Sequence, residues 1–157
     1  MTAPAISPVV LTIADPAAMR DLGGRLASVA VPGDLLCLFG ELGAGKTQLA
    51  KGFGTGLDVA ETVNSPSFVL MSEYAGRLIL FHVDLYRLAD GVGPYEDGLL
   101  DDRQADGVTI IEWADRLGAD LPPSRLDVRI DGTGDGPRTV TIEAADGRHE
   151  RYLRALA

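Results

Sequence analysis

The chain has 157 residues, 46% of them hydrophobic and 24% charged, which is typical of one globular domain and not of a disordered or fibrous protein. A formal net charge of -9 argues against a broad footprint on RNA or DNA and favours a partner with a basic surface. One cysteine excludes a disulfide framework, and because neither a signal peptide nor an apolar run of roughly 18 residues is visible, we expect a cytoplasmic protein without membrane contact.

The N-terminal part predicts a strand and then a helix. Val9–Ile13 is a short β-branched run, and Asp15 and Pro16 combine a helix N-cap with a first-turn proline. In the helix that should follow, apolar residues recur at spacings of three or four and form a stripe that would lie on a sheet. These residues are Met19, Leu22, Leu26 and Val29. Pro32 and Gly33 then end the helix and lead into the next strand.

The next strand runs directly into a phosphate-binding loop. Residues 34–39 are largely apolar, and the sequence GELGAGKT at residues 40–47 matches the pattern GxxxxGK[ST]. Glycines let the backbone point successive N–H groups at an anion, Lys46 supplies a charge for the β- and γ-phosphates, and Thr47 offers a hydroxyl to Mg²⁺. The helix that begins here aims its positive end at the same oxygens. We predict nucleotide binding by Gly40, Glu41, Leu42, Gly43, Ala44, Gly45, Lys46, Thr47 and Gln48.

Two strand-like segments follow the loop, at residues 67–74 and 78–84. Three residues with a central glycine join them, which suggests an antiparallel hairpin. Because continuous βαβ alternation would give a purely parallel sheet, we predict an α/β fold whose central sheet is mixed parallel and antiparallel and is flanked by helices. Residues 85–107 are turn-rich and acidic, and we expect irregular structure there with only a weak helical stretch near residues 94–100.

The C-terminal part predicts a buried strand followed by a hairpin and a helix. Residues 108–113 are apolar or β-branched until the strand ends in Glu112 and Trp113. A helical turn, the two strands of a closing hairpin and a last helix are predicted at residues 114–118, 125–131, 138–144 and 148–157. Neither a repeat nor a linker interrupts the pattern, so we predict that residues 1–157 form a single domain built around the phosphate loop.

Nucleotide hydrolysis needs more than a phosphate loop, because a carboxylate near Mg²⁺, a group that orients water and a segment that senses the γ-phosphate are also required. Serine hydroxyls of residues 63–68 could reach Mg²⁺ or the γ-phosphate, although an ordinary Ser-Pro turn is the commoner explanation of such a segment. Strand alternation places His82, Asp84 and Tyr86 on one side. We interpret His82 as a structural residue. Glu112 lies at a strand end, where open α/β sheets place ligand-binding groups.

The motifs GELGAGKT, SPSF, HVDLYR and IIEW, in this order and at these separations, closely resemble those of the TsaE family, also called YjeE. The resemblance extends from about Asp15 to Pro122. It implies a P-loop fold with a mixed sheet and an ATPase that uses ATP and Mg²⁺ in bacterial tRNA threonylcarbamoyladenosine synthesis. It also implies the TsaB and TsaD proteins as partners, with hydrolysis supporting turnover of their complex and contact with tRNA only through that complex.

The same resemblance assigns roles to individual residues. Asp84 and Glu112 match acidic positions around Mg²⁺ and the attacking water, and with Thr47 they form the implied metal site, in which either carboxylate could contact the ion directly. The family's adenine is expected near Asp15. The switch segment corresponds to Ser65, Pro66, Ser67 and Phe68. Trp113 follows the proposed catalytic Glu112, and we predict that it lies beside the nucleotide.

Two departures from the family pattern are visible. Ser67 stands where the family usually has threonine, and it keeps the hydroxyl while losing a methyl group. Residues 91–96 stand where the family usually has a Pro-Glu-Leu helix start, which leaves the local structure open.

Two other classes of protein are alternatives. A small-molecule kinase with a phosphate loop would need an acceptor pocket and an arginine-rich lid, whereas Arg103, Arg116 and Arg125 are scattered. A nucleotide sensor without hydrolysis would lack water-orienting carboxylates, so Asp84 and Glu112 count against it. GTP specificity would bring an Asn/Thr-Lys-x-Asp segment, and neither lysine of the chain lies in one.

Overall fold

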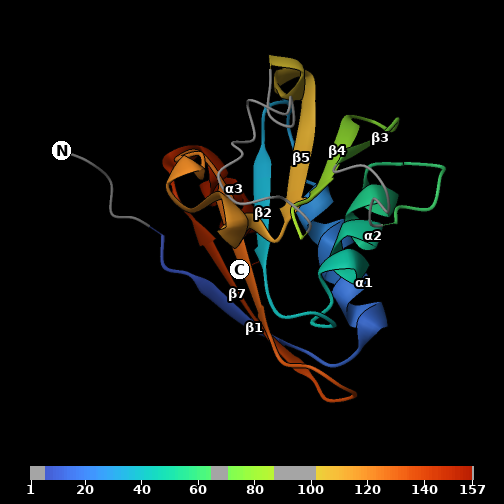
Figure 1. Ribbon diagram of the computed structural model, residues 1–157, viewed down its shortest axis with the longest axis vertical. Coiled ribbons are helices and arrows are strands. Elements are labelled where there is room, and N and C mark those ends of the chain that lie inside the picture. The colour runs from blue at the N-terminus through green and yellow to red at the C-terminus, as the bar shows by residue number, and fades with distance from the viewer. Residues whose placement is uncertain (1–5, 65–70, 87–101, 157) are drawn as a thin grey trace.

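The computed structural model describes residues 6–64, 71–86 and 102–156. Its strands are β1 (Val9–Ile13), β2 (Leu35–Phe39), β3 (Met71–Tyr74), β4 (Ile79–Asp84), β5 (Gly107–Glu112), β6 (Leu126–Asp131) and β7 (Arg138–Ala144). They form one seven-stranded sheet in the order β1-β7-β6-β2-β5-β4-β3 (Figure 1). The central strands β6, β2, β5 and β4 pair in parallel, whereas β1, β7 and β3 pair antiparallel with their neighbours. The predicted mixed sheet is therefore confirmed.

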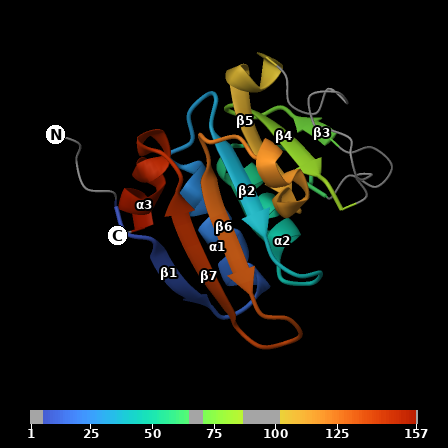
Figure 2. The ribbon, with the colours of Figure 1, turned by 60° about the vertical axis from the view of Figure 1, so that its left-hand side comes forward.

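The helices are α1 (Pro16–Ala27), α2 (Lys46–Gly56) and α3 (Glu150–Leu156), and three short 3₁₀ helices are η1 (Asp102–Asp106), η2 (Ala114–Asp120) and η3 (Gly147–His149). In Figure 2, α1 and α2 lie side by side behind the sheet. Asp15 is the N-cap of α1 as predicted, because its Oδ1 accepts from the N–H of Ala18 at 2.8 Å. Met19, Leu22 and Leu26 of the predicted stripe are buried. The helix ends before Val29, which packs against the core from the following turn.

The central strand β2 is buried on both faces, which explains its unbroken apolar sequence. Leu36 and Leu38 pack in the core beneath α1, α2 and α3. Leu35 and Cys37 face the other side, where Leu117 of η2 covers them. Burial, with a smaller contribution from the nearby Asp127, raises the pKa of the Cys37 thiol to about 12, so this cysteine is a buried apolar residue and not a reactive one.

Helices α1 and α2 approach each other backbone to backbone through glycines. A Cβ atom added to Gly52 would lie 1.9 Å from the carbonyl oxygen of Arg20, and one added to Gly23 would lie 2.2 Å from that of Leu49. Only hydrogen at these two positions permits the observed separation. The contact fixes the N-terminus of α2, and hence the preceding loop, relative to α1.

A buried carboxylate at the start of β2 holds the C-terminal helix. Asp34 is 1% exposed, and its Oδ2 accepts from the hydroxyl of Tyr152 at 2.5 Å and from a guanidinium N–H of Arg151. His149 completes the anchor, since its Nε2 accepts from the N–H of Leu35 at 3.1 Å. A buried charge needs such partners, and these partners place α3 on the same side of the sheet as α1.

Both predicted hairpins are present, as β3 with β4 and as β6 with β7. The first strand of the earlier hairpin is described only from Met71, because residues 65–70 lie outside the described ranges. The expectation for residues 85–107 is tested only at its ends, where Asp102–Asp106 form a 3₁₀ helix in place of irregular structure and β5 begins one residue earlier than predicted. The weak helical stretch at residues 94–100 lies outside the described residues.

Candidate functional site

The phosphate loop and the two predicted acidic residues meet at one edge of the sheet. Strands β2, β5 and β4 are parallel neighbours, so their carboxyl ends lie together. Glu112 is paired in register with Leu38 of β2 on one side and with Asp84 of β4 on the other. The loop at residues 40–45 follows β2 directly and ends at the N-terminus of α2. Ligands of open α/β sheets bind at such an edge.

The loop has the backbone geometry of an anion cradle. Gly43 and Gly45 have φ values of 83° and 116°, which side-chain-bearing residues rarely adopt. Gly45 is the N-cap of α2 and provides no side-chain cap. No N-cap side chain therefore covers the first N–H groups of α2, and the helix dipole at this end favours a negatively charged ligand.

Lys46 folds back over the loop that it follows. Its Nζ donates to the carbonyl oxygens of Gly40 at 2.5 Å and Glu41 at 2.9 Å, and it lies 4.1 Å from the ring centroid of Trp113. Burial lowers the pKa of this ammonium, and the charges of Glu112, Asp84 and Asp115 partly oppose that shift. The charged group thus sits above the loop, where a phosphate would meet it.

Glu112 connects the loop to the neighbouring strand. Its Oε1 and Oε2 lie 3.1 and 3.3 Å from the hydroxyl of Thr47, and its Oε2 lies 2.5 Å from Nε2 of His82. Glu112 is 2% exposed and His82 is fully buried. Because a carboxylate only accepts, we assign the proton of His82 to Nε2. The interpretation of His82 as a core residue agrees with its burial but missed this contact.

Asp84 and Trp113 complete the edge. Oδ1 of Asp84 accepts from the N–H of Tyr86 at 3.0 Å, and burial raises the pKa of Asp84 although that hydrogen bond opposes the rise. Trp113 has a φ of 59°, a left-handed conformation that is strained for a tryptophan. This turn brings its ring to 5.0 Å from the ring of Tyr86 and over the Lys46 ammonium.

The donor set suits Mg²⁺. Thr47, Glu112 and Asp84 supply hydroxyl and carboxylate oxygens, the ligands that this ion prefers. Within residues 6–64, 71–86 and 102–156, no cluster of three or more His, Cys, Asp or Glu side chains is arranged to hold a metal by itself. Mg²⁺ commonly binds through one or two protein carboxylates together with substrate phosphates, which fits a site built beside a phosphate loop.

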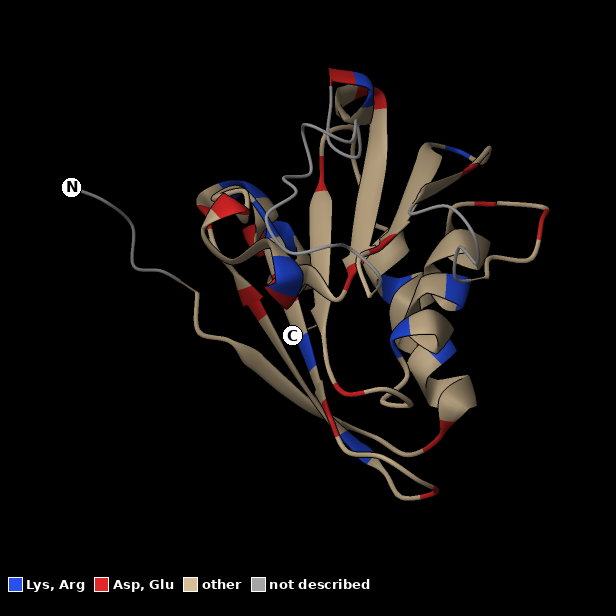
Figure 3. Cartoon of the chain, viewed as in Figure 1, with Lys and Arg blue, Asp and Glu red and all other residues tan. Residues whose placement is uncertain are grey.

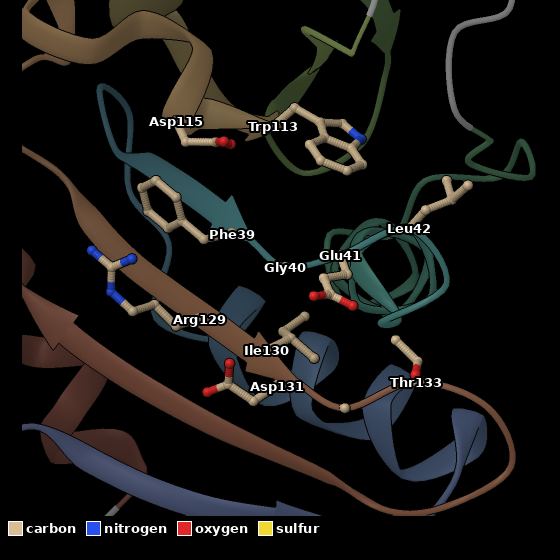
Figure 4. Close-up of a pocket in the computed structure, with 11 residues that line it drawn as sticks. Phe39, Gly40, Glu41, Leu42, Trp113, Asp115, Arg129, Ile130, Asp131 and Thr133 are labelled. Atoms are coloured by element: carbon tan, nitrogen blue, oxygen red, sulfur yellow. The ribbon is translucent and has the colours of Figure 1, made fainter.

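A cavity of about 600 Å³ lies beside the loop (Figure 4). Its lining consists of Phe39, Gly40, Glu41, Leu42, Trp113, Asp115, Arg129, Ile130, Asp131, Gly132 and Thr133. The cavity is thus lined both by loop residues, namely Gly40, Glu41 and Leu42, and by Trp113. Leu42 is 72% exposed. Lys46 and Thr47 are not part of this lining, so the cavity extends the site away from the start of α2.

Of the remaining predicted residues, Asp15 and Gln48 have partners within the chain, and the switch segment is not described. The carboxylate of Asp15 is engaged as the N-cap of α1, and Gln48 accepts from Arg20 at 2.7 Å. The switch segment Ser65, Pro66, Ser67 and Phe68 lies outside the described ranges.

One residue close to the loop was missed by the sequence analysis. Arg138 of β7 donates to the carbonyl oxygens of Ala44 and Gly43.

A strand, a phosphate loop and a helix in a mixed sheet, with carboxylates at the ends of the next two parallel strands, define a P-loop NTPase fold. A family model described as threonylcarbamoyl adenosine biosynthesis protein TsaE matches residues 13–140. The chain therefore belongs to the TsaE family.

Curated relatives and a solved structure agree with this assignment. The chain is 39% identical to the tRNA threonylcarbamoyladenosine biosynthesis protein TsaE of Bacillus subtilis over 145 residues, 91% of this chain and 90% of the relative. It is 42% identical to the TsaE protein of Streptomyces coelicolor over 144 residues, 87% and 95% of the two chains. A crystal structure of Bacillus subtilis YdiB superposes with a TM-score of 0.80 at 33% identity and covers 98% of this chain and 97% of that one. Among the helices described here, none is long and apolar enough to cross a bilayer.

Proposed function

We propose that this protein is a Mg²⁺-dependent ATPase that supports tRNA threonylcarbamoyladenosine biosynthesis in the cytoplasm, where tRNA is modified. The observation that carries the ATPase proposal is the contact between Thr47 and Glu112. It joins the hydroxyl at the end of the phosphate loop to a buried carboxylate on the adjacent strand. Membership of the TsaE family and the functional descriptions of the relatives support the pathway.

The residues divide into a group that binds the nucleotide and a group that promotes hydrolysis. N–H groups of the phosphate loop and of the first turn of α2, together with the Lys46 ammonium, would hold the phosphates. Thr47, Asp84 and Glu112 would hold Mg²⁺, which when bound neutralises phosphate charge. Glu112, which is hydrogen-bonded to His82, would orient the attacking water molecule. The whole chain would act as one P-loop ATPase domain.

The charge distribution favours protein partners over direct tRNA contact. The net charge is -9, and the cartoon of Figure 3 shows the Lys and Arg positions of the described residues interspersed with Asp and Glu positions. Phosphate-backbone recognition depends on a basic patch or stripe. We therefore propose that the protein acts on the TsaB and TsaD proteins and meets tRNA only through their complex.

A purified mixture tests the proposal. ATP hydrolysis is measured for the chain alone and with TsaB and TsaD, with Mg²⁺ and with EDTA. We expect turnover that depends on Mg²⁺ and is lost in Lys46→Ala, because that change removes the cation aimed at the phosphates. An equal rate in the Lys46→Ala protein, or in EDTA, would contradict an ATPase built on this loop.

A further inference from the structure

Arg138 contacts the phosphate loop although it lies far from the loop in the sequence. It is the first residue of β7 and pairs in register with Ile13 of β1. Its Nε donates to the carbonyl oxygen of Ala44 at 3.0 Å, and its Nη2 donates to that of Gly43 at 3.2 Å. These two carbonyls belong to the segment whose N–H groups form the anion cradle.

The same guanidinium also holds the connection between β6 and β7. Nη1 donates to the carbonyl oxygens of Thr133 at 3.3 Å and of Gly136, and Nη2 donates to that of Gly134 at 2.8 Å. A guanidinium has five N–H donors. Five backbone carbonyls surround it here, two from the loop and three from the hairpin, so the group is engaged within the protein and is not left to bind a phosphate.

The contact has a direct consequence for the loop. A peptide group that points its carbonyl toward Arg138 points its N–H in the opposite direction, because the peptide unit is planar and trans. Gly43 has a positive φ, and a Cβ added there would meet nothing within 4 Å, so side-chain packing does not fix this peptide. The guanidinium holds the Ala44 carbonyl, whereas the peptide that carries the Gly43 carbonyl is held from both sides, by Arg138 and by the hydrogen bond from the Ala44 N–H to the carbonyl oxygen of Glu41 at 3.0 Å.

We propose that Arg138 is a positioning residue for nucleotide binding. By holding the carbonyl groups of Gly43 and Ala44 toward itself, it keeps the loop in its binding conformation before a phosphate arrives. Preorganised loops bind more tightly because less ordering is needed on binding. The inference rests on the proposed function, since it requires that the loop bind nucleotide phosphates. It adds a residue outside the GxxxxGKT motif and a role for the hairpin.

The test separates the shape of the guanidinium from its charge. Arg138→Lys keeps the charge, but one ammonium with three donors cannot satisfy five carbonyls. We expect Arg138→Lys and Arg138→Ala each to weaken Mg-ADP and Mg-ATP binding by about tenfold to a hundredfold, the scale of lost charge-assisted hydrogen bonds. The hydrolysis rate at saturating ATP should change less than about threefold, because the loss concerns the organisation of the site and not the chemistry.

Arg125 provides the matched control. It immediately precedes β6, at the end of the same hairpin away from the β6–β7 connection, and it donates to Asp127 and to the carbonyl oxygen of Pro122. Arg125→Lys and Arg125→Ala report how much any lost arginine contact lowers stability. Calorimetric titration is run at a temperature where thermal unfolding without nucleotide shows every variant folded. Amide hydrogen exchange of residues 40–47 without nucleotide is a second readout, and it should be faster in both Arg138 variants and unchanged in both Arg125 variants.

Each outcome decides the proposal. Weaker binding in both Arg138 variants, faster exchange in the loop and unchanged affinity in both Arg125 variants would support it. Parental affinity in Arg138→Lys would overturn it, because charge alone would then suffice. Equal losses in the Arg125 variants would also overturn it, since the effect would be general destabilisation. If the parental protein binds no nucleotide, the proposed function itself fails, and the two failures are thereby distinguished.

Discussion

The Oε2 atom of Glu112 lies 2.5 Å from Nε2 of His82, and both side chains are buried. The same carboxylate accepts from the hydroxyl of Thr47 on the phosphate loop. One acidic group therefore joins β4, β5 and the start of α2. A buried carboxylate with two polar partners has little freedom to rotate, which is the property required of a group that orients a reactant.

His82→Leu tests whether this orientation matters. We expect the substitution to lower ATP hydrolysis by about tenfold, the lower end of what a misplaced acid–base group costs, while ADP affinity changes little because His82 does not reach the loop. His82→Gln, which retains a donor for Glu112, should keep more of the rate. Steady-state hydrolysis and calorimetry measure the two effects. Parental hydrolysis in His82→Leu would leave His82 with a packing role only.

Glu112→Gln and Asp84→Asn separate binding from turnover. ATP carries several negative charges, so two nearby carboxylates contribute little net affinity for the nucleotide. We expect binding within about tenfold of the parental value, a change of about 1.4 kcal/mol. Hydrolysis should fall by about a hundredfold or more, as expected on removing a positioned acid–base group. If either variant hydrolyses ATP at the parental rate, the carboxylate that it lacks is not part of the mechanism.

Trp113 should report nucleotide binding by its fluorescence. The Lys46 ammonium lies 4.1 Å from its ring centroid, and phosphates bound in the loop would compete for that ammonium. We expect intensity or emission wavelength to change on adding Mg-ADP. Since Trp113 is the chain's one tryptophan, the signal needs no correction for others. An unchanged spectrum at saturating Mg-ADP, with binding verified by calorimetry, would show that the Trp113 ring does not lie beside the bound nucleotide.

Gly52→Ala should destabilise the fold because helices α1 and α2 are in backbone contact. The added methyl would lie 1.9 Å from the carbonyl oxygen of Arg20, which cannot move without shifting α1. We expect a loss of about 3 kcal/mol or more in the free energy of unfolding, the upper range of overpacking. Gly147→Ala, where an added Cβ meets nothing within 4 Å, is the control and should be nearly neutral. Denaturant unfolding of both variants gives the comparison.

Local patterns in the sequence predicted much of this architecture. The glycines and Lys46 of the phosphate loop follow a fixed spacing, and Asp15 and the stripe from Met19 to Leu26 follow helix capping and periodicity. Such signals depend on neighbours in the chain. They did not predict the end of α1 correctly, because the helix ends at Ala27 and Val29 belongs to the turn that follows.

Contacts between distant segments could not be read from these patterns. The pairing of His82 with Glu112 depends on the register of β4 against β5, which the whole sheet determines. Arg138 meets the loop across 94 residues of sequence, and Asp34 meets Tyr152 across 118. A lone arginine and a lone aspartate carry no spacing signal, so only the assembled fold shows what they bind.

The most direct test of the central claim is threonylcarbamoyladenosine formation in a reconstituted mixture containing TsaB, TsaD, tRNA and ATP. The quantity measured is the number of adenosines modified per TsaB–TsaD complex, with the parental protein, with Glu112→Gln and without either. We predict repeated rounds of modification only with the parental protein. Repeated turnover that is equally fast without this protein, or with Glu112→Gln in its place, would contradict the account.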